Sequence, residues 1–168
     1  LADAGYPDGK GLPTMEYLYN ESTGHQLIGE ALQSMWKEIG VNVTLVSQEW
    51  NTFLTTRKNG EYQIARNGWL ADYNDPISFL DMWITGSGNN DAQWSNKEYD
   101  ALITRIKASS DRVERMQLMH QAEKIIFDES MLCPIYYYVD IFLKSQKLQG
   151  FYSSPLGYKY FMYTTVTP

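Results

Sequence analysis

One strand–helix–strand pattern restricts the possible folds of this chain more than any other feature. Apolar residues recur at helical spacing over about residues 24–39, and Gly40 follows at the position that commonly ends a helix. Apolar and polar residues then alternate over residues 41–47, and a short aromatic-rich run at residues 15–20 predicts another strand. A strand, a helix and a second strand that are connected by short loops form a right-handed crossover between parallel strands. The pattern therefore predicts an α/β fold.

The rest of the chain continues the alternation of helices and strands. We expect a helix at residues 50–58 ended by Asn59-Gly60, followed by a strand at 62–69 and a helix start at Asp75-Pro76. A capping box of Ser95 and Glu98 predicts a helix to about Ser109, and Asp111 with Glu114 opens the next helix. The segment CPIYYYVDIFL at residues 133–143 predicts a late strand. The opening residues Leu1–Ala4 are expected to be the tail of a helix broken by Gly5. This order favours one α/β layer fold.

The composition excludes several classes of protein. A hydrophobic fraction of 43% and a charged fraction of 20% are typical of a globular domain, and 168 residues suit a single one. The net charge of -6, without any block of basic residues, argues against nucleic acid as a partner, because phosphate contacts supply most of that affinity. No apolar run reaches the roughly 18–20 residues of a membrane span. The chain opens without an initiator Met, and we expect a piece excised from a longer protein.

Few residues of this sequence could hold a metal ion or a cofactor. Cys133 is the only cysteine, so no internal disulfide or paired-cysteine site can form, and we expect its thiol to be buried. The histidines, His25 and His120, are far apart and lack the spacing of a transition-metal motif. The stretch GSGNN matches no phosphate-binding loop. We therefore expect no metal and no cofactor.

The stretch ARNGWLADYNDP at residues 65–76 contains the candidates for chemistry. Asp72 and Asp75 could act as the acid and base of a hydrolase, because the pattern places them after a parallel strand, where α/β sheets bind ligands. Asp75, however, precedes Pro76 and fits the cap of a helix, which leaves Asp72 alone. No serine-nucleophile motif is present either. Catalysis is therefore the lesser alternative, and no residue is assigned a catalytic role.

Asp72 belongs instead to a set of residues that could hold a zwitterion. The set combines a carboxylate, two guanidinium groups, an imidazole and two large aromatic faces, all expected near one edge of the sheet. Its members are Asp72, Trp69, Arg66, Arg57, Trp50 and His25. A ligand ammonium and a ligand carboxylate would each make charge-assisted hydrogen bonds worth about 1.5–3 kcal/mol. The alternative is structural: Asp72 caps a turn, both arginines are solvated or paired, and Trp69 lies in the core.

The segment W-x-x-D-Y-x-D-P at residues 69–76, preceded by Arg66 and followed by Phe79, resembles the solute-binding proteins of peptide ABC importers. Three further segments, LADAGYPDGKG, WKEIGVNVTLVSQEWNTFL and CPIYYYVDIFL, are similar to segments of the same family, and most of all to its oligopeptide-binding branch. The resemblance implies a lobe of a type II periplasmic-binding-protein fold, with a mixed, mostly parallel sheet flanked by helices. Residues 1–168 would then be a single α/β lobe, the C-terminal part of a larger two-lobe protein.

The same resemblance implies roles for individual residues. Asp72 falls where the family receives the α-ammonium of a peptide. Arg57, Arg66 and His25 fall at positions similar to those that meet the peptide carboxylate. The positions that resemble walls of side-chain pockets are Trp69, Trp50 and Tyr138.

The function that the resemblance implies is capture without catalysis. A protein of this family binds a periplasmic or extracellular oligopeptide between its two lobes and delivers it to the membrane subunits of an ABC permease. The expected partners are the peptide, the permease and the other lobe, and the expected location is extracytoplasmic, either in the periplasm or on the outer face of the membrane as a lipoprotein. The alternatives are a binder of another solute on the same fold, such as a nickel chelate or an opine, and the hydrolase.

Overall fold

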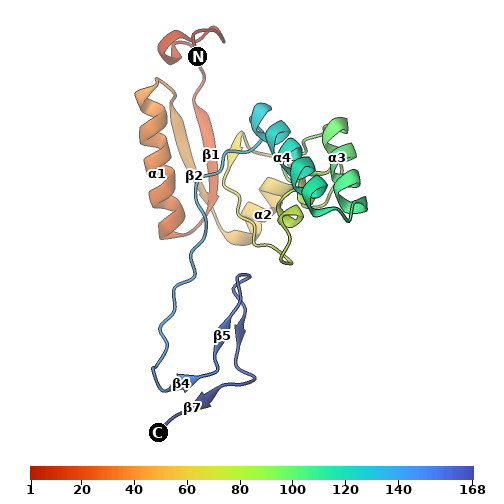
Figure 1. The fold of residues 1–168 in the computed structure, drawn as a ribbon. Coiled ribbons are helices and arrows are strands. Elements are labelled where there is room, and N and C mark those ends of the chain that lie inside the picture. Colours follow the sequence, from red (N-terminus) through yellow and green to blue (C-terminus); the bar gives the residue numbers. More distant parts are fainter. The chain divides into compact units, whose positions relative to one another are not determined.

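The computed structural model describes all 168 residues, which divide into two compact units. The first unit comprises Leu1–Gly68 and Gly88–Trp94, and the second comprises Trp69–Ser87 and Ser95–Pro168. Figure 1 traces the helices and strands of both along the chain. None of the helices combines the length and the apolar character that crossing a membrane requires.

A parallel three-stranded sheet forms the centre of the first unit, in the order β2-β1-β3. The elements of this unit are η1 (Pro7–Gly9), β1 (Met15–Asn20), α1 (Thr23–Glu38), β2 (Val43–Gln48), α2 (Trp50–Lys58) and β3 (Ile64–Ala65). Helix α1 is the crossover from β1 to β2 (Figure 1), and the ladder runs from the pair Met15 and Val43 to the pair Asn20 and Gln48. The predicted strand–helix–strand unit with parallel strands is confirmed, as is the helix at residues 50–58.

The third strand is much shorter than the predicted strand at residues 62–69. Only its two residues Ile64–Ala65 pair with β1. The backbone N–H of Arg66 still donates to the carbonyl of Leu18 at 2.8 Å, but the side-chain oxygen of Asn67 accepts from the N–H of Gly68 at 2.7 Å. This local side-chain bond satisfies the backbone without a neighbouring strand, so the ladder ends there.

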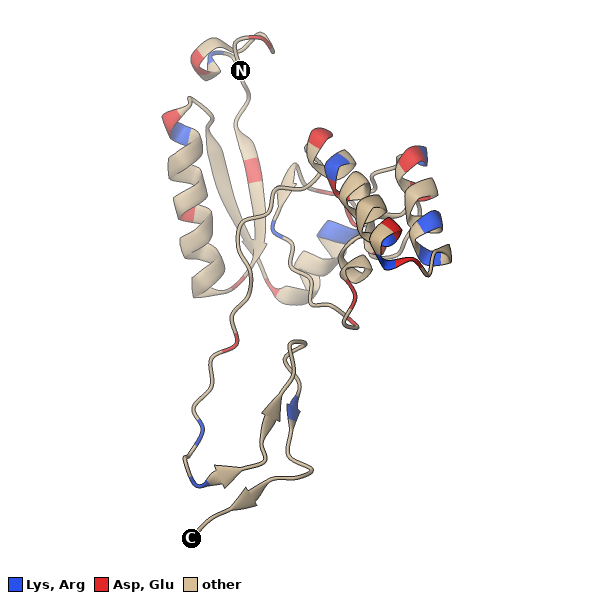
Figure 2. Ribbon diagram, in the orientation of Figure 1, with Lys and Arg blue, Asp and Glu red and all other residues tan.

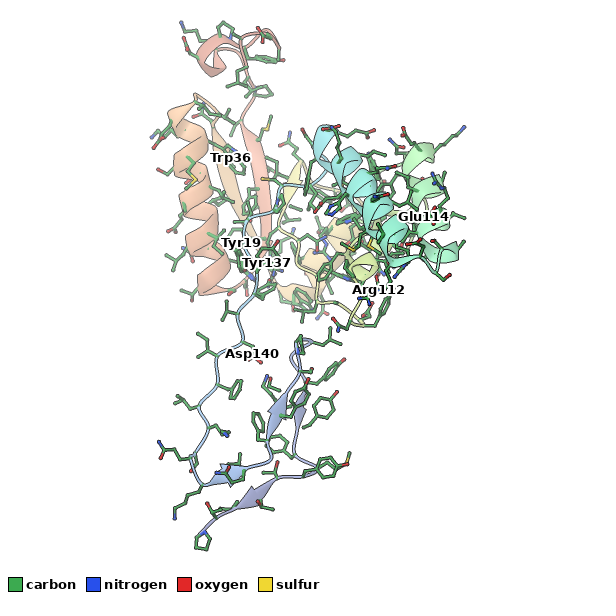
Figure 3. All side chains as sticks on the ribbon, in the orientation of Figure 1. Tyr19, Trp36, Arg112, Glu114, Tyr137 and Asp140 are labelled. Atoms are coloured by element: carbon green, nitrogen blue, oxygen red, sulfur yellow. The ribbon has the colours of Figure 1, made fainter.

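Aromatic side chains form much of the core between α1 and the sheet. The rings of Tyr17 and Tyr19 stack with their centroids 6.1 Å apart, and Trp36 of α1 meets Tyr17 edge-on at 6.1 Å. Tyr19 and Trp36 are labelled in Figure 3. Gly29 lets the helix approach, since a Cβ there would lie 3.3 Å from the Tyr17 ring. Phe53 of α2 is fully buried. Burial of a side chain of this size stabilises the fold by about 1.5–3 kcal/mol.

Two packed helices form the centre of the second unit. Its helical elements are η2 (Pro76–Phe79), η3 (Asp81–Trp83), α3 (Lys97–Ala108) and α4 (Arg112–Asp128). The buried side chains of α3 and α4 are Tyr99, Leu102, Ile103, Ile106, Leu118, Met119, Ala122 and Ile126. Basic and acidic residues are interspersed along both helices (Figure 2). Asp111 caps α4, as predicted, by accepting from the backbone N–H of Val113 at 2.8 Å.

The cap of α3 is one residue further along the chain than predicted. The side-chain oxygen of Asn96 accepts from the backbone N–H of Tyr99 at 3.0 Å. The predicted capping box of Ser95 and Glu98 is therefore wrong. The hydroxyl of Ser95 lies instead 3.0 Å from the hydroxyl of Thr85, which gives it a different hydrogen-bond partner.

Residues 133–143 form no strand, although their composition predicts one. The strands near the C-terminus pair only with one another, β4 (Leu148–Gln149) with β7 (Thr165–Val166) and β5 (Tyr152–Ser153) with β6 (Lys159–Tyr160). A segment rich in β-forming residues becomes a strand only where its backbone can form hydrogen bonds with a neighbouring strand. This open segment has no neighbouring strand and is exposed to solvent, and its Tyr137, labelled in Figure 3, is 96% exposed. Cys133 is exposed as well, so its predicted burial is also wrong.

Side-chain contacts join this segment to the short strands that follow it. The ring of Phe142 lies 5.3 Å from that of Phe151, which lies 5.2 Å from that of Phe161. The ammonium of Lys159 sits 5.2 Å from the centre of the Phe142 ring and pairs with Asp140. Aromatic and charged side chains therefore connect residues 133–143 to the short strands, in place of the backbone hydrogen bonds of a sheet.

Two glycines meet where the N-terminal segment touches the end of α1. Residues 1–5 form hydrogen-bonded turns in place of the predicted helix tail, with the N–H of Gly5 donating to the carbonyl of Ala2 at 2.9 Å. Gly40 ends α1 with a φ of +82°, and a Cβ on it would lie 2.1 Å from the carbonyl oxygen of Asp8. Gly9, with a φ of +73°, would place a Cβ 2.0 Å from the carbonyl oxygen of Gly40. Only glycine fits at this contact.

We expect Gly40→Ala to destabilise the chain more than Gly11→Ala. Gly11 has a similar φ of +83°, but a Cβ on it would meet nothing within 4 Å. The control therefore measures the left-handed backbone alone, about 1–2 kcal/mol, whereas Gly40→Ala adds the clash with Asp8. Urea denaturation followed by circular dichroism measures both losses. Equal losses in the two variants would contradict the close contact.

Candidate functional site

The structure brings Arg66 and His25 together at the carboxyl end of β1. Asn20, the last residue of that strand, accepts from the Nη1 of Arg66 through its side-chain oxygen at 3.1 Å. Its backbone carbonyl lies 3.3 Å from the Nδ1 of His25, in the first turn of α1. Arg66 directly follows β3, whose carboxyl end lies at the same edge of the parallel sheet. Two of the predicted site residues, a guanidinium and an imidazole, therefore share Asn20 as a hydrogen-bond partner at this edge.

His25 is neutral at neutral pH in this environment. Burial lowers the pKa of its imidazole, and the positive charge of Arg66 lowers it further, while the bond to the carbonyl of Asn20 acts in the opposite direction. In the tautomer with a proton on Nδ1, the ring donates to that carbonyl and leaves Nε2 without a proton. A carboxylate that approached this pair would favour protonation of the ring.

Arg57 is the second predicted guanidinium, and it is already ion-paired. Its Nε lies 2.7 Å from the Oδ2 of Asp91, and the two side chains are only 13% and 14% exposed. Its Nη1 donates to the side-chain oxygen of Asn67 at 3.0 Å, and its guanidinium lies 5.0 Å from the centre of the Phe53 ring. The ring of Trp50 stacks on Phe53 at 6.0 Å and is itself about half exposed. Arg57 was expected either to bind a ligand or to have a structural role, and the structure shows it in an ion pair with Asp91.

Sequence reasoning missed Asp91 as the partner of Arg57. The two residues are 34 positions apart, and Asp91 follows the loop GSGNN, which matches no phosphate-binding motif. Spacing along the chain cannot reveal a pair that is formed only when a loop folds against the end of a helix. Asn20 was missed for the same reason, since it is 46 positions from Arg66.

The two aspartates of ARNGWLADYNDP have different environments in the second unit. Asp75 caps η2, as predicted, by accepting from the N–H of Ile77 at 3.0 Å, and it also pairs with the Nη2 of Arg115 at 2.9 Å. Asp72 is exposed, and only its backbone N–H is engaged, with the hydroxyl of Ser78 at 3.0 Å. Its carboxylate makes no hydrogen bond or ion pair within its unit. Asp75 is therefore a structural residue, whereas Asp72 can accept a ligand group.

The protonation of Asp75 argues against a role as a general acid. Burial by itself would raise the pKa of its carboxyl group, but the N–H of Ile77 and the guanidinium of Arg115 outweigh burial and hold the pKa below its usual range. A carboxylate hydrolase requires one carboxyl group with a raised pKa. Asp75 has the opposite shift.

The predicted aromatic residues of the second unit are Trp69 and Tyr138. Trp69 is half-buried, and its indole nitrogen is buried without a hydrogen-bond partner. A buried donor that is left unpaired is costly, so this N–H is available to an acceptor. Tyr138 lies in the open segment at residues 133–143, with its ring 5.2 Å from that of Tyr136 and about half of its surface exposed.

Comparisons with known proteins identify the family of the chain. Residues 1–91 match the family model described as bacterial extracellular solute-binding proteins, family 5, middle. The chain is 37% identical over 163 residues to the oligopeptide-binding protein OppA of Bacillus subtilis, and the match covers 96% of this chain and 30% of that protein. It is 38% identical over 162 residues to the probable deoxycholate-binding periplasmic protein YgiS of Escherichia coli, covering 95% of this chain and 30% of that protein.

A solved structure shows the same architecture. The crystal structure of Haemophilus influenzae OppA in complex with RPPGFSPFR is similar with a TM-score of 0.80 and 34% sequence identity, covering 89% of this chain and 29% of that one. The chain therefore spans about 30% of the length of the relatives that it matches.

We expect His25→Gln to flatten the loss of stability of this chain at acidic pH. Because the pKa of His25 is lower in the folded chain than its ordinary value of 6.5, the unfolded chain binds the proton more readily, and the folded state loses stability as the pH falls below about 6.5. Unfolding free energies at about pH 7.5 and about pH 5 measure this loss. The control is His120→Gln, on the exposed face of α4. An equal loss in the native chain and in His25→Gln would contradict the lowered pKa.

Proposed function

Because the chain belongs to family 5 of the bacterial extracellular solute-binding proteins, we propose that it is one lobe of a protein that captures oligopeptides for an ABC importer. The predicted α/β class and type II periplasmic-binding-protein fold are confirmed by the similarity to the Haemophilus influenzae structure. The predicted family is confirmed as well. The chain is proposed to form the C-terminal lobe of that larger protein.

The open carboxylate of Asp72 is the observation on which this proposal depends most. A peptide presents an ammonium at one end and a carboxylate at the other. Asp72 has no partner for its carboxylate within its unit, unlike Asp75, which is held by Arg115. We propose that Asp72 receives the peptide ammonium and that Arg66, with His25, receives the carboxylate. Charge-assisted hydrogen bonds of this kind are worth about 1.5–3 kcal/mol each.

The proposed pocket walls are aromatic. Trp69 offers a buried indole N–H to a ligand carbonyl, and Trp50 and Tyr138 present half-exposed rings. Flat aromatic surfaces accept side chains of many shapes, while an extended peptide backbone is bound by strand-like hydrogen bonds, directly or through water. The site would therefore select peptides by their ends and their backbone more than by their side chains.

The partners follow from the proposed role. A second lobe would close on the peptide by a hinge motion, stabilised because the ligand touches both lobes. The closed protein would deliver the peptide to the membrane subunits of the permease from an extracytoplasmic position. The relatives named above are binding proteins, and the lowered pKa of Asp75 does not suit a catalytic acid. We therefore propose transport without catalysis.

A second candidate ligand comes from the relative that is named as a probable deoxycholate-binding protein. A bile acid has a carboxylate but no ammonium. Such a ligand would use Arg66 and His25 without using Asp72. The two candidates therefore differ in their dependence on Asp72.

We expect Asp72→Asn to weaken binding of tetra-alanine by about 10- to 100-fold in the full-length protein. The loss corresponds to one charge-assisted hydrogen bond, and isothermal titration calorimetry measures it. N-acetylated tetra-alanine, which has no ammonium, should bind the native protein and Asp72→Asn equally. The matched control is Asp75→Asn, which should lower thermal stability without changing the dissociation constant. A change of less than twofold in Asp72→Asn, or tight binding of deoxycholate in place of the peptide, would contradict the proposal.

A further inference from the structure

We propose that the folded protein deamidates spontaneously at Asn67, with Arg57 as the activating group, and that the fold protects Asn59 from the same reaction. The sequence contains two Asn-Gly pairs, Asn59-Gly60 and Asn67-Gly68. In such a pair the backbone nitrogen of the glycine can attack the side-chain amide carbon of the asparagine, because glycine has no side chain to hinder the close approach. The modification concerns the chain itself and does not depend on the proposed ligand.

The reaction passes through a cyclic imide. The glycine nitrogen gives its proton to water or hydroxide and forms a bond to the amide carbon of the asparagine, from which ammonia leaves. Water then opens the imide at one of its carbonyl groups. Opening at one carbonyl yields aspartate, and opening at the other yields isoaspartate, in which the main chain runs through the side-chain carbon. The reaction consumes water and releases ammonia, so it needs no other reactant.

The reacting groups of Asn67 and Gly68 are already in contact. The N–H of Gly68 donates to the side-chain oxygen of Asn67 at 2.7 Å, so its nitrogen lies beside the amide carbon that it attacks. Both residues lie outside the helices and strands, and Gly68 is exposed to the water that takes up the proton. Contact between reacting groups before the reaction removes much of its entropic cost.

Arg57 activates the amide of Asn67. Its Nη1 donates to the same side-chain oxygen at 3.0 Å. Since an arginine can only donate, the atom that faces it is the oxygen of the amide and not the nitrogen. This oxygen becomes negatively charged when Gly68 attacks, and a donor that already points at it stabilises the charge as it forms. The bond from Nε to Asp91 at 2.7 Å holds the guanidinium in this position.

The corresponding groups of Asn59 and Gly60 are engaged elsewhere. The N–H of Gly60 donates to the backbone carbonyl of Arg57 at 3.0 Å, in the turn that ends α2. The side-chain nitrogen of Asn59 donates to the carboxylate of Glu61 at 3.2 Å, and this negative charge opposes a second one on the amide. Asn59 is more exposed than Asn67, so exposure alone would predict the opposite preference.

Deamidation would change the covalent connection between the two units. Gly68 is the last residue of its segment in the first unit, and Trp69 is the first residue of the second unit. The aspartate product would add a negative charge beside Arg57, which is already paired with Asp91. The isoaspartate product would also lengthen the main chain directly before Gly68.

The first test follows both sites in the full-length protein at mildly alkaline pH. Mass spectrometry of proteolytic peptides measures the conversion of each amide to an acid, and labelling by an isoaspartyl methyltransferase detects isoaspartate. We expect Asn67 to react about tenfold faster than Asn59, or more, in the folded protein. In concentrated urea, where neither arrangement persists, the two sites should react at similar rates. Equal rates in the folded protein, or a faster reaction at Asn59, would overturn the proposal.

The second test is Arg57→Lys, which separates activation from proximity. Lysine keeps a positive charge beside Asp91 but lacks the second arm of the guanidinium that reaches Asn67. We expect the rate at Asn67 to fall by about tenfold, while the rate at Asn59 serves as the internal reference and stays unchanged. The matched control is Lys58→Arg, which should change neither rate. An unchanged rate at Asn67 in Arg57→Lys would contradict activation by Arg57, and if this variant does not fold, the comparison of the two sites in the native protein still decides whether Asn67 is the site.

Discussion

Parallel pairing of β1 with β2 through the crossover helix α1 is the constraint on which the candidate site depends. Parallel strands end at the same edge of a sheet, and the loops at that edge gather residues that are distant in sequence. Asn20 ends β1, and its side chain and backbone carbonyl contact Arg66 and His25. The strand register thus determines which polar groups become neighbours, before any ligand is considered.

The same principle separates the two carboxylates that look alike in sequence. Asp72 and Asp75 are two residues of one type in one loop, yet one is open and the other is bonded to a backbone N–H and to Arg115. Arg57 is likewise held by a charged partner, because it is ion-paired with Asp91. The role of each of these side chains follows from its partner and not from its type. Recognition of a charged ligand requires a residue whose charge is not already used by the fold, as is the case for the carboxylate of Asp72 within its unit.

Sequence reasoning succeeded where the relevant forces are local. Helix α2 was predicted with its bounds because the helical run and the Asn59-Gly60 that ends it are adjacent in the chain, and Asp75 was predicted as a cap because Pro76 follows it directly. It failed where the partner is distant. The pair of Arg57 and Asp91, 34 positions apart, has no local signal. The run at residues 133–143 has a strong tendency to form a strand, but a strand also requires a neighbour, which tendency alone cannot supply.

The open segment at residues 133–143 has a consequence for the solubility of the chain. Extended, exposed runs rich in tyrosine and isoleucine can pair with the same run of another molecule and start a cross-β assembly. Pro134 lacks a backbone donor, Asp140 carries a negative charge within the run and Lys144 a positive charge directly after it, so the sequence contains residues that oppose such stacking. Of these, Asp140 is drawn toward Lys159, which leaves less of its charge to keep two chains apart. Self-association of this chain would accordingly begin at its tyrosines and be sensitive to salt.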